Sequence, residues 1–338
     1  MSQYYNLELD KITQLVLDRQ YKKILVQMPE GLLNTPLKTV VETLEPLGVQ
    51  IIAVGDPSYG ICDLAVNLAT QLECELLIHF GHNEFGFKQE IKTRTNMFLE
   101  ILIIPAFVTF GISSYFPKLS EDLKELKWST VGLISTVQHL KNLKELKNYL
   151  DTVGIDNTIQ GEGQILGCHV ENAGGFFNKV DGIISLHAGY FHTYGLLLCT
   201  SIPILQLDPF TGEIRYFPNE ERNKLIRKRH SFISQARNAK VWGILGSSKL
   251  GQYHPDKISR IEKILGDHNK LKISVIAENL NFENLTNFTW VDAWVDTACP
   301  RIAIDDHISF EKPILTFKEF LYLFNEVTWE KILTSGFF

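Results

Sequence analysis

Short apolar runs bounded by turn residues recur along the chain and predict buried β-strands. The first two runs span residues 23–28 and 49–54, and the stretch between them turns at 29–31 and continues as a helix to Leu47. A strand, a helix and a strand in this order form a βαβ unit with a parallel strand pair. An amphipathic helix over residues 7–17 precedes the unit, and we expect it to cover a sheet edge.

The same order of patterns occurs in two further copies. The first copy continues with a predicted helix over 63–75 and a strand over 76–80. The second copy comprises a strand over 130–135, a helix over 139–150, a short strand over 158–160 and a strand over 181–189. The third comprises a strand over 240–245, a helix over 255–265 and strands over 272–277 and 290–295. Such self-similarity indicates one supersecondary unit used three times.

We therefore predict an α/β fold of three related units with mostly parallel sheets. The units are assigned to residues 1–115, 116–220 and 221–338, with boundaries in two mixed, turn-rich stretches near 111–127 and 208–221. A basic helix over 222–237 follows the second stretch. We expect its charged side to be solvated and its apolar residues to be buried.

One cysteine follows a predicted strand in each unit. These residues are Cys62, Cys168 and Cys299, and each lies in a turn beside glycine, proline, aspartate or arginine. The third cysteine lies farther from the leading strand of its unit than the other two, so we expect an insertion there. In α/β sheets, ligands bind at the carboxyl ends of strands. If the units pack around a pseudo-threefold axis, the three thiolates would meet in a central cavity.

The wide spacing of these cysteines excludes a zinc knuckle or a ferredoxin-type run. Soft thiolates favour zinc or an iron-sulfur cluster, and three protein ligands would leave one iron of a 4Fe-4S cluster open to a substrate. Cys74 and Cys199 instead lie inside apolar segments that we expect to be helix or strand. Both are interpreted as packing residues.

Composition narrows the partners and the compartment. The 338 residues include 45% hydrophobic and 21% charged residues, and the net charge of −6 disfavours binding to nucleic acid. The apolar run at 98–112 is too short to cross a membrane and contains Glu100 and Pro105. The start of the chain lacks the pattern of a secretory signal. Five cysteines without an export signal predict a cytoplasmic protein with reduced thiols.

The sequence resembles the diphthamide-biosynthesis family in four ordered motifs. They are ILVQMPEGLL (24–33), DPSYGICDLA (56–65), GQILGC (163–168) and ACPRIAIDD (298–306). The likeness covers most of residues 22–323, and the length resembles that of the archaeal homodimeric member.

The resemblance implies a radical transferase acting on a protein histidine. Its 4Fe-4S cluster would be held by the three cysteines, and the reduced cluster would cleave S-adenosylmethionine between sulfur and the γ-carbon. The products would be methylthioadenosine and a 3-amino-3-carboxypropyl radical, which adds to C2 of a histidine imidazole on translation elongation factor 2. This is the first step of diphthamide biosynthesis. The resemblance also implies a homodimer and an electron donor protein.

Polar residues in or near the motifs are candidates to bind S-adenosylmethionine. Gln164, close to Cys168, would hold the amino or carboxylate group of the methionine part. The full candidate set is Glu30, Gly31, Asp56, Tyr59, Gly60, Gln164, His192 and Arg301. Each of them has an alternative role in a turn or in a hydrogen bond between units. His79, His82 and His187 are disfavoured as metal ligands, because three thiolates already account for the cluster.

Three other functions are weighed. A quinolinate-synthase-like dehydratase also resembles three α/β units around a cluster on three cysteines, but PEGLL and ACPRIAIDD argue against it. A non-catalytic accessory subunit of a diphthamide-synthesis complex could have lost a ligand, and this chain has all three cysteines. A cluster-free α/β binding protein would keep its colour and iron content when Cys62 is replaced by alanine.

Overall fold

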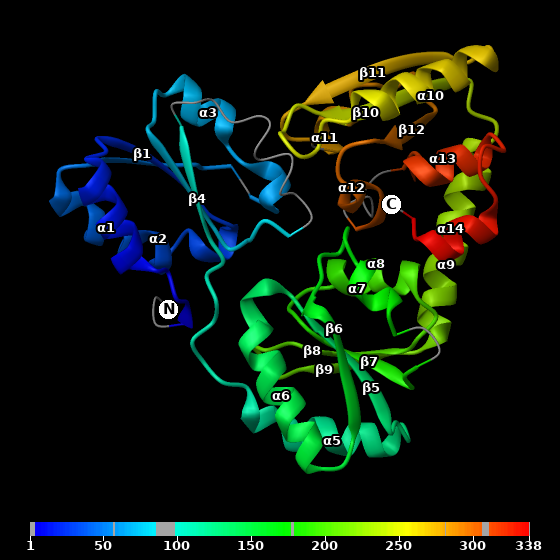
Figure 1. The fold of residues 1–338 in the computed structure, drawn as a ribbon. Coiled ribbons are helices and arrows are strands. Elements are labelled where there is room, and N and C mark those ends of the chain that lie inside the picture. Colours follow the sequence, from blue (N-terminus) through cyan, green and yellow to red (C-terminus); the bar gives the residue numbers. More distant parts are fainter. Residues whose placement is uncertain are drawn as a thin grey trace. The chain divides into compact units, whose positions relative to one another are not determined.

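A computed structural model describes residues 4–56, 58–85, 99–176, 179–280, 282–305 and 311–337 of the chain. Within these ranges the chain forms three separate sheets, which run in sequence order from blue to red in Figure 1. The chain divides into two compact units. The first comprises Met1–Gly111, Val137–Lys141 and Lys249–Gly251, and the second comprises the remaining residues.

The first sheet is fully parallel and has the strand order β2-β1-β3-β4. Its strands are β1 (Lys23–Gln27), β2 (Gln50–Ala53), β3 (Leu76–Phe80) and β4 (Glu100–Ile104). Its helices are α1 (Leu9–Arg19), α2 (Thr35–Leu44) and α3 (Val66–Gln71), and its 3-10 turns are η2 (Glu30–Leu32), η3 (Glu45–Leu47) and η4 (Ile61–Asp63). Strand β4 lies in the apolar run over residues 98–112. The sequence analysis excluded this run as a membrane span but did not predict a strand there.

Both faces of the first sheet are covered, which explains its apolar central strands. Ile12 and Val16 of α1 pack with Ile24 and Val26 of β1 on one face. Helix α3 packs on the other face, against Leu25 and its neighbours. Helix α1 therefore covers a sheet face, and the expectation that it covers an edge was wrong, because its apolar stripe meets side chains of the central strand β1.

The second sheet has the order β6-β5-β7-β8-β9, and its last strand is antiparallel. Its strands are β5 (Thr130–Ser135), β6 (Asp156–Gln164), β7 (Gly182–Leu186), β8 (Ile204–Leu207) and β9 (Ile214–Phe217). The helices around it are α5 (Phe116–Glu125), α6 (Leu140–Thr152), α7 (Glu171–Gly174), α8 (Phe191–Cys199) and α9 (Asn219–Ala236), and η5 (Ser113–Tyr115) and η6 (Val137–His139) are 3-10 turns. The stretches expected to be mixed and turn-rich thus contain a helix, α5, and a strand, β9.

The third sheet is parallel and has the order β11-β10-β12-β13. Its strands are β10 (Val241–Ser247), β11 (Leu271–Ala277), β12 (Ala293–Asp296) and β13 (Ile314–Thr316). Its helices are α10 (Pro255–Asp267), α11 (Phe282–Leu285), α12 (Pro300–Ile304), α13 (Phe317–Leu323) and α14 (Trp329–Ser335). Helix α10 covers β10 and β11 (Figure 1), and its buried isoleucines pack with Trp242 and Ile244.

The three sheets share one topology. In each, the second strand in sequence lies beside the first, and the third and fourth strands follow on the other side. The internal repeat read from the sequence is therefore confirmed at the level of strand order. The cysteines do not all occupy equivalent places, however. Cys62 and Cys168 follow the second strand of their sheets, whereas Cys299 follows the third strand, β12. The longer spacing reflects a further helix and strand, and the expected insertion was wrong.

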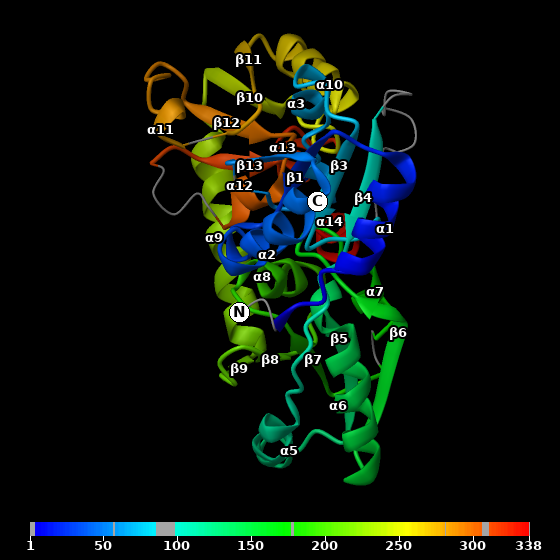
Figure 2. The same cartoon turned by 90° about the vertical axis from the view of Figure 1, so that its left-hand side faces the viewer.

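Helix α9 joins the second and third sheets within the second compact unit. It contacts β9 and also β13 and α13, and both views show it passing between the two sheets (Figure 1 and Figure 2). The three assigned sequence ranges stay a prediction, because the second and third sheets share one compact unit. Among the helices of the described ranges, none is both long enough and apolar enough to span a membrane.

Candidate metal centre

The first cysteine lies in a short turn at the carboxyl edge of the first sheet. Cys62 is the middle residue of η4, between the buried residues Ile61 and Asp63, and it is itself partly exposed. Gly60 provides space for the thiol, because a Cβ at that position would lie 3.3 Å from the Cys62 sulfur. The two buried neighbours anchor the turn and leave the thiol at the surface of the sheet edge.

Gln27, the last residue of β1, holds this turn in place through hydrogen bonds of its side chain. Its side-chain amide donates to the Asp63 carbonyl at 2.6 Å, and its Oε1 accepts the Ala65 N–H at 3.1 Å. Oε1 also lies 2.9 Å from Nδ1 of His79, on the adjacent strand β3. One buried glutamine thus fixes the backbone on the carboxyl side of Cys62.

The hydrogen bonds define how His79 is protonated. An amide oxygen can only accept, so Nδ1 of His79 carries the proton that it donates to Gln27. Burial, with a smaller effect of His82, lowers the pKa of His79 well below its usual value, so the ring is neutral and its Nε2 is an acceptor. Nε2 lies 2.9 Å from Nδ1 of His82, which must therefore donate. Both ring nitrogens of His79 are therefore engaged in hydrogen bonds.

The second cysteine lies at the tip of a two-residue turn after β6. Leu166 and His169 exchange backbone hydrogen bonds of 3.0 and 2.9 Å, which leaves Cys168 at the tip of the hairpin. Helix α8 packs directly against this turn. A Cβ at Gly195 would lie only 2.0 Å from the Gly167 carbonyl oxygen, so the helix can approach this closely only with glycine there.

The third cysteine precedes α12 and follows β12. The Asp296 carboxylate accepts the N–H of Ala298 at 2.9 Å and also a backbone hydrogen bond from Cys299. Burial raises the pKa of Asp296 to about 7, against the opposing effect of these N–H groups. Thr297 donates from its hydroxyl to the Leu245 carbonyl at 2.7 Å, which fixes the turn to β10.

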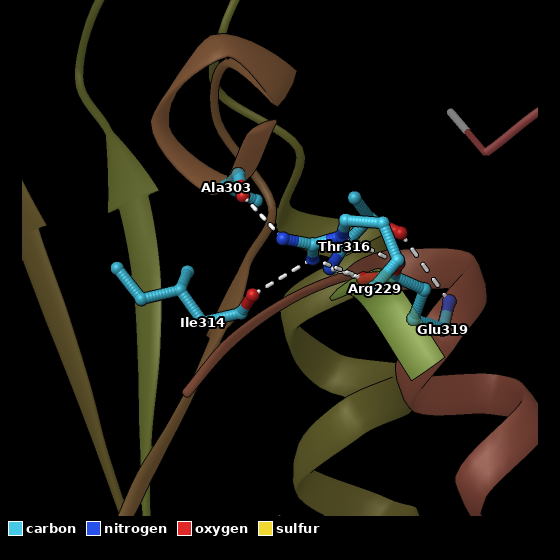
Figure 3. Close-up of polar contacts among 5 residues, drawn as sticks. All are labelled: Arg229, Ala303, Ile314, Thr316 and Glu319. Carbon is cyan, nitrogen blue, oxygen red and sulfur yellow. Dashed lines mark hydrogen bonds and ion pairs between the residues drawn. The ribbon is translucent and has the colours of Figure 1, made fainter. Parts of the chain in front are cut away.

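A buried arginine holds the other end of the Cys299 helix. Arg229, on α9, donates to the Ala303 carbonyl of α12 at 2.5 Å and to the Ile314 carbonyl at the start of β13 at 2.9 Å. Its Nε and Nη2 bind the two carboxylate oxygens of Glu319 at 2.8 and 2.5 Å. Glu319 also forms a capping box with Thr316 at the start of α13 (Figure 3). Both charged side chains are completely buried, although the basic helix was expected to present its charges to solvent.

The second and third cysteine turns are linked through α8 and α12. The Arg301 guanidinium, two residues after Cys299, lies 5.7 Å from the centre of the Phe191 ring. The neighbouring residue, His192, has a buried Nδ1 without a hydrogen-bond partner. Burial and the nearby Arg301 charge lower the pKa of His192 to about 4, so its ring is neutral near pH 7. Two of the predicted site residues, His192 and Arg301, are therefore brought together.

The two remaining cysteines differ in chemistry from the candidate ligands. Burial raises the pKa of the Cys199 thiol to about 11 and also raises that of Cys74. Such thiols stay protonated near pH 7 and are poor metal ligands. Cys199 ends α8, as expected for an apolar segment, whereas Cys74 lies in the connection between α3 and β3. Its assignment to a helix or strand was wrong, and its burial is confirmed.

Comparison with known proteins places the chain in a family. Residues 28–333 match the family model of diphthamide synthesis proteins, which spans most of the chain. The chain belongs to the diphthamide synthesis family. The resemblance found in the four sequence motifs is thereby confirmed.

Relatives in the diphthamide synthesis family match over nearly the whole chain. The 2-(3-amino-3-carboxypropyl)histidine synthase of Pyrococcus horikoshii is 31% identical and aligns over 92% of this chain and 89% of that protein. Subunit 1 of the same synthase from Homo sapiens is 26% identical, over 99% of this chain and 75% of the relative. The crystal structure of Dph2 from Pyrococcus horikoshii with a 4Fe-4S cluster has a TM-score of 0.80 at 28% identity, covering 96% and 92% of the two chains. This confirms the predicted fold of three α/β units.

The other candidate residues of this diphthamide-family chain are divided between the compact units. The exposed residues Glu30 and Gly31 lie in η2 after β1, and the exposed residues Asp56 and Tyr59 lie in the loop after β2, the neighbouring parallel strand of the first sheet. Their roles stay predictions. Gln164, at the end of β6, is buried to 1% exposure, and its carbonyl accepts a hydrogen bond from Asn172 at 2.7 Å.

The meeting of the three thiols also stays a prediction. Cys62 belongs to the first compact unit, whereas Cys168 and Cys299 belong to the second. Across the described residues, no group of three or more histidine, cysteine, aspartate or glutamate side chains is assembled in a metal-binding arrangement.

The sequence reasoning missed the residues that support these turns. Gln27 lies in the motif that carried the family resemblance, but its position inside an apolar strand suggested only packing. Arg229 stood among other basic residues of a helix, where nothing distinguishes it from a solvated arginine. A buried polar residue at the carboxyl end of a parallel strand was the signal available for Gln27. No comparable signal marks Arg229.

Proposed function

We propose that this chain is a 2-(3-amino-3-carboxypropyl)histidine synthase that catalyses the first step of diphthamide synthesis on translation elongation factor 2. The observation that carries the proposal is the placement of one partly exposed cysteine at the carboxyl edge of each sheet. The family match and the relatives named as this synthase support the same activity.

The chemistry of the donor set fits a 4Fe-4S cluster. Cys62, Cys168 and Cys299 lie in turns after strands and are partly exposed, while the two thiols with raised pKa values, Cys74 and Cys199, do not follow a strand. Thiolates are the usual ligands of such clusters. When bound, the cluster would supply the electron that cleaves S-adenosylmethionine and an iron to which this substrate can bind. The protein's part is to hold three thiolates in place and to orient the substrate.

Charge and burial suggest how the chain would orient S-adenosylmethionine. Its sulfonium is a cation, and the exposed carboxylates of Glu30, in η2, and Asp56, in the loop after β2, lie at one sheet edge. The Arg301 guanidinium suits the carboxylate of the methionine part. The His192 ring next to it is neutral. Its buried Nδ1 can accept or donate one hydrogen bond, depending on the tautomer.

Orientation decides which carbon is transferred. Three carbons are bonded to the sulfonium sulfur, and the reaction requires cleavage at the γ-carbon of the methionine part. Anchoring the amino and carboxylate groups of that part would fix the γ-carbon relative to the open iron. Replacement of the C2 hydrogen of the acceptor histidine by the 3-amino-3-carboxypropyl group then releases one proton and one electron, and this electron balances the one consumed in the cleavage. Methylthioadenosine is the other product.

The chain would act as a homodimer served by an electron donor protein. The Pyrococcus horikoshii relative is named as the synthase itself, while the human and Schizosaccharomyces pombe relatives are each named subunit 1. The higher identity to the former supports a chain that works without a second gene product. The presence of all three cysteines disfavours an accessory subunit, and the family match removes the dehydratase.

The deciding experiment is an anaerobic turnover assay. The reconstituted chain is reduced with dithionite and mixed with S-adenosylmethionine, and the adenosyl product is identified by mass spectrometry. Methylthioadenosine, together with a 3-amino-3-carboxypropyl adduct on the histidine of added elongation factor 2, is the expected result. 5′-Deoxyadenosine would refute cleavage at the γ-carbon. A full, reducible cluster without any product would favour the accessory subunit.

A further inference from the structure

A segment far away in sequence packs against the turn that carries Cys62. Residues Lys249–Gly251 follow β10, the first strand of the third sheet, but belong to the first compact unit. The Gly251 N–H donates to the Cys62 carbonyl at 2.9 Å. Leu250 packs against the apolar cluster that contains Ile61, the first residue of η4, and Leu64, which follows η4. We call these three residues the Lys249–Gly251 segment.

A buried ion pair adds a second attachment. Lys249 Nζ lies 2.8 Å from Oδ2 of Asp63, and the two side chains are only 9% and 7% exposed. The same oxygen lies 3.4 Å from the Tyr59 N–H, and the ammonium lies 5.8 Å from the centre of the Tyr59 ring. A pair this buried is sensitive to the loss of either partner, because the remaining charge would lose the opposite charge beside it in a site with little access to water.

Close backbone approach makes Gly251 specific to this contact. A Cβ at position 251 would lie 2.6 Å from the Cα of Cys62 and 2.8 Å from its Cβ. These distances are shorter than carbon atoms can approach without moving. Any side chain at this position would therefore displace the backbone of Cys62 itself.

The two attachments complement the one made by Gln27. Gln27 binds the Asp63 carbonyl and the Ala65 N–H, on the carboxyl side of the cysteine. The Lys249–Gly251 segment binds the Cys62 carbonyl and the Asp63 carboxylate. The cysteine backbone is thus held both from its own sheet and from a segment 186 residues away in sequence.

We propose that the Lys249–Gly251 segment positions Cys62 for cluster binding, with Gly251 and Lys249 as positioning residues. This inference rests on the proposed function in assigning the cluster to Cys62. Partners that orient metal ligands are commonly worth about 10- to 100-fold in metal affinity. Loss of the segment's contacts would leave Cys62 in place in the sequence but free to move away from the cluster.

The test compares Gly251→Ala and Lys249→Met with matched controls. Gly174→Ala introduces the same methyl group where no atom lies within 4 Å, and Lys263→Met removes an exposed lysine from α10. Each variant is reconstituted anaerobically, its reduced cluster is recorded by electron paramagnetic resonance, and iron release to a chelator is timed. We expect release to be about 10-fold faster in both test variants and unchanged in both controls.

A second measurement separates positioning from the proposed activity. In the cluster-free protein, the alkylation rate of each cysteine is measured by peptide mapping after treatment with iodoacetamide. We expect both test variants to change the rate at Cys62 and to leave the rates at Cys168 and Cys299 unchanged. Lys249→Arg should restore the wild-type rate, because it retains the charge. If Gly251→Ala does not fold, the comparison of Lys249→Met with Lys249→Arg still tests the proposal.

Wild-type iron release and a wild-type Cys62 rate in Lys249→Met would overturn the proposal. Equal changes at all three cysteines would also overturn it, since they would indicate general loosening of the fold. If the wild-type chain binds no cluster at all, the proposed function fails. The alkylation comparison would still decide whether the segment holds Cys62.

Discussion

Replacing Arg229 by methionine should strongly destabilise the second compact unit. The substitution removes a guanidinium that makes two hydrogen bonds to Glu319 and one each to the Ala303 and Ile314 carbonyls, all in a site with no exposed side-chain surface. Methionine fills a similar volume but offers no donor. The Glu319 carboxylate would therefore stay buried, and of the hydrogen bonds described here it would keep the one from the Thr316 N–H of the capping box, at 2.8 Å.

The expected loss follows from this burial. Removing one partner of a buried ion pair typically costs about 3–5 kcal/mol in the free energy of unfolding. The two orphaned carbonyls favour the upper end of that range. For a unit of this size, each kcal/mol corresponds to about 2–4 °C in Tm, so Tm should fall by roughly 6–20 °C. Because Arg229 anchors the end of α12, iron bound at Cys299 should also be released faster.

The assay is thermal unfolding of the cluster-free protein, followed by circular dichroism and calorimetry. The cluster is left out because any group that binds only the folded state would add stability of its own. Arg227→Met, on the same helix but exposed, serves as the control and should change stability by less than about 0.5 kcal/mol. The double variant Arg229→Met/Glu319→Leu should recover part of the loss, because it removes both buried charges.

Two results would refute this reasoning. One is a loss below about 1 kcal/mol for Arg229→Met, which would mean that water or a rearranged side chain compensates the buried carboxylate. The other is a double variant less stable than Arg229→Met alone. In that case the carboxylate would contribute through its capping box on α13 and not through the arginine.

Three further predictions follow from the cysteine turns. Cys62→Ala should lose most of the bound iron after reconstitution, whereas Cys74→Ala, at a buried packing site, should retain it; equal iron contents would contradict the ligand assignment. Gly195→Ala should cost about 1–3 kcal/mol in unfolding free energy, measured with denaturant, because its Cβ would meet the Gly167 carbonyl oxygen at 2.0 Å. The neutral ring of His192 has its pKa lowered from 6.5 to about 4. The stability that depends on this neutral ring is therefore fully present above pH 6.5 and falls by roughly 3 kcal/mol as the pH is lowered to 4. A His192→Gln variant should gain stability relative to wild type as the pH is lowered over that range, and the absence of this gain would contradict the assignment.

The strands were largely predictable because burial on both faces leaves a local record. Strands β3 and β5 have the predicted bounds, and β1 and β10 differ from theirs by a residue or two. Strand β9 escaped prediction because it is a short antiparallel edge strand whose middle residues, Arg215 and Tyr216, are exposed. The long helix expected after β1 is divided into η2, α2 and η3, consistent with prolines at positions 36 and 46, which lack the backbone N–H of a helix interior.

The candidate ligands could also be recognised in the sequence, but the strand of the sheet that each of them follows could not. A cysteine that follows an apolar run and stands among turn residues is a local pattern, and it separated the three candidate ligands from Cys74 and Cys199. That Cys299 follows the third strand of its sheet could not be read locally. Strand order depends on which strands pair, and the sequence spacing alone was equally compatible with an insertion.

The sequence by itself determined where most of the buried central strands lie, which cysteines follow a strand, and which family the chain resembles. All three are properties of short segments, whose apolar periodicity and turn residues are set by neighbours along the chain. Only the tertiary structure decided that Arg229 is buried against Glu319, 90 residues away, and that Lys249 meets Asp63 across 186 residues. A charged residue on a helix or loop has the same local sequence whether it is solvated or buried. Its environment is created by distant segments that exclude water from it, and that environment exists only once the chain has folded.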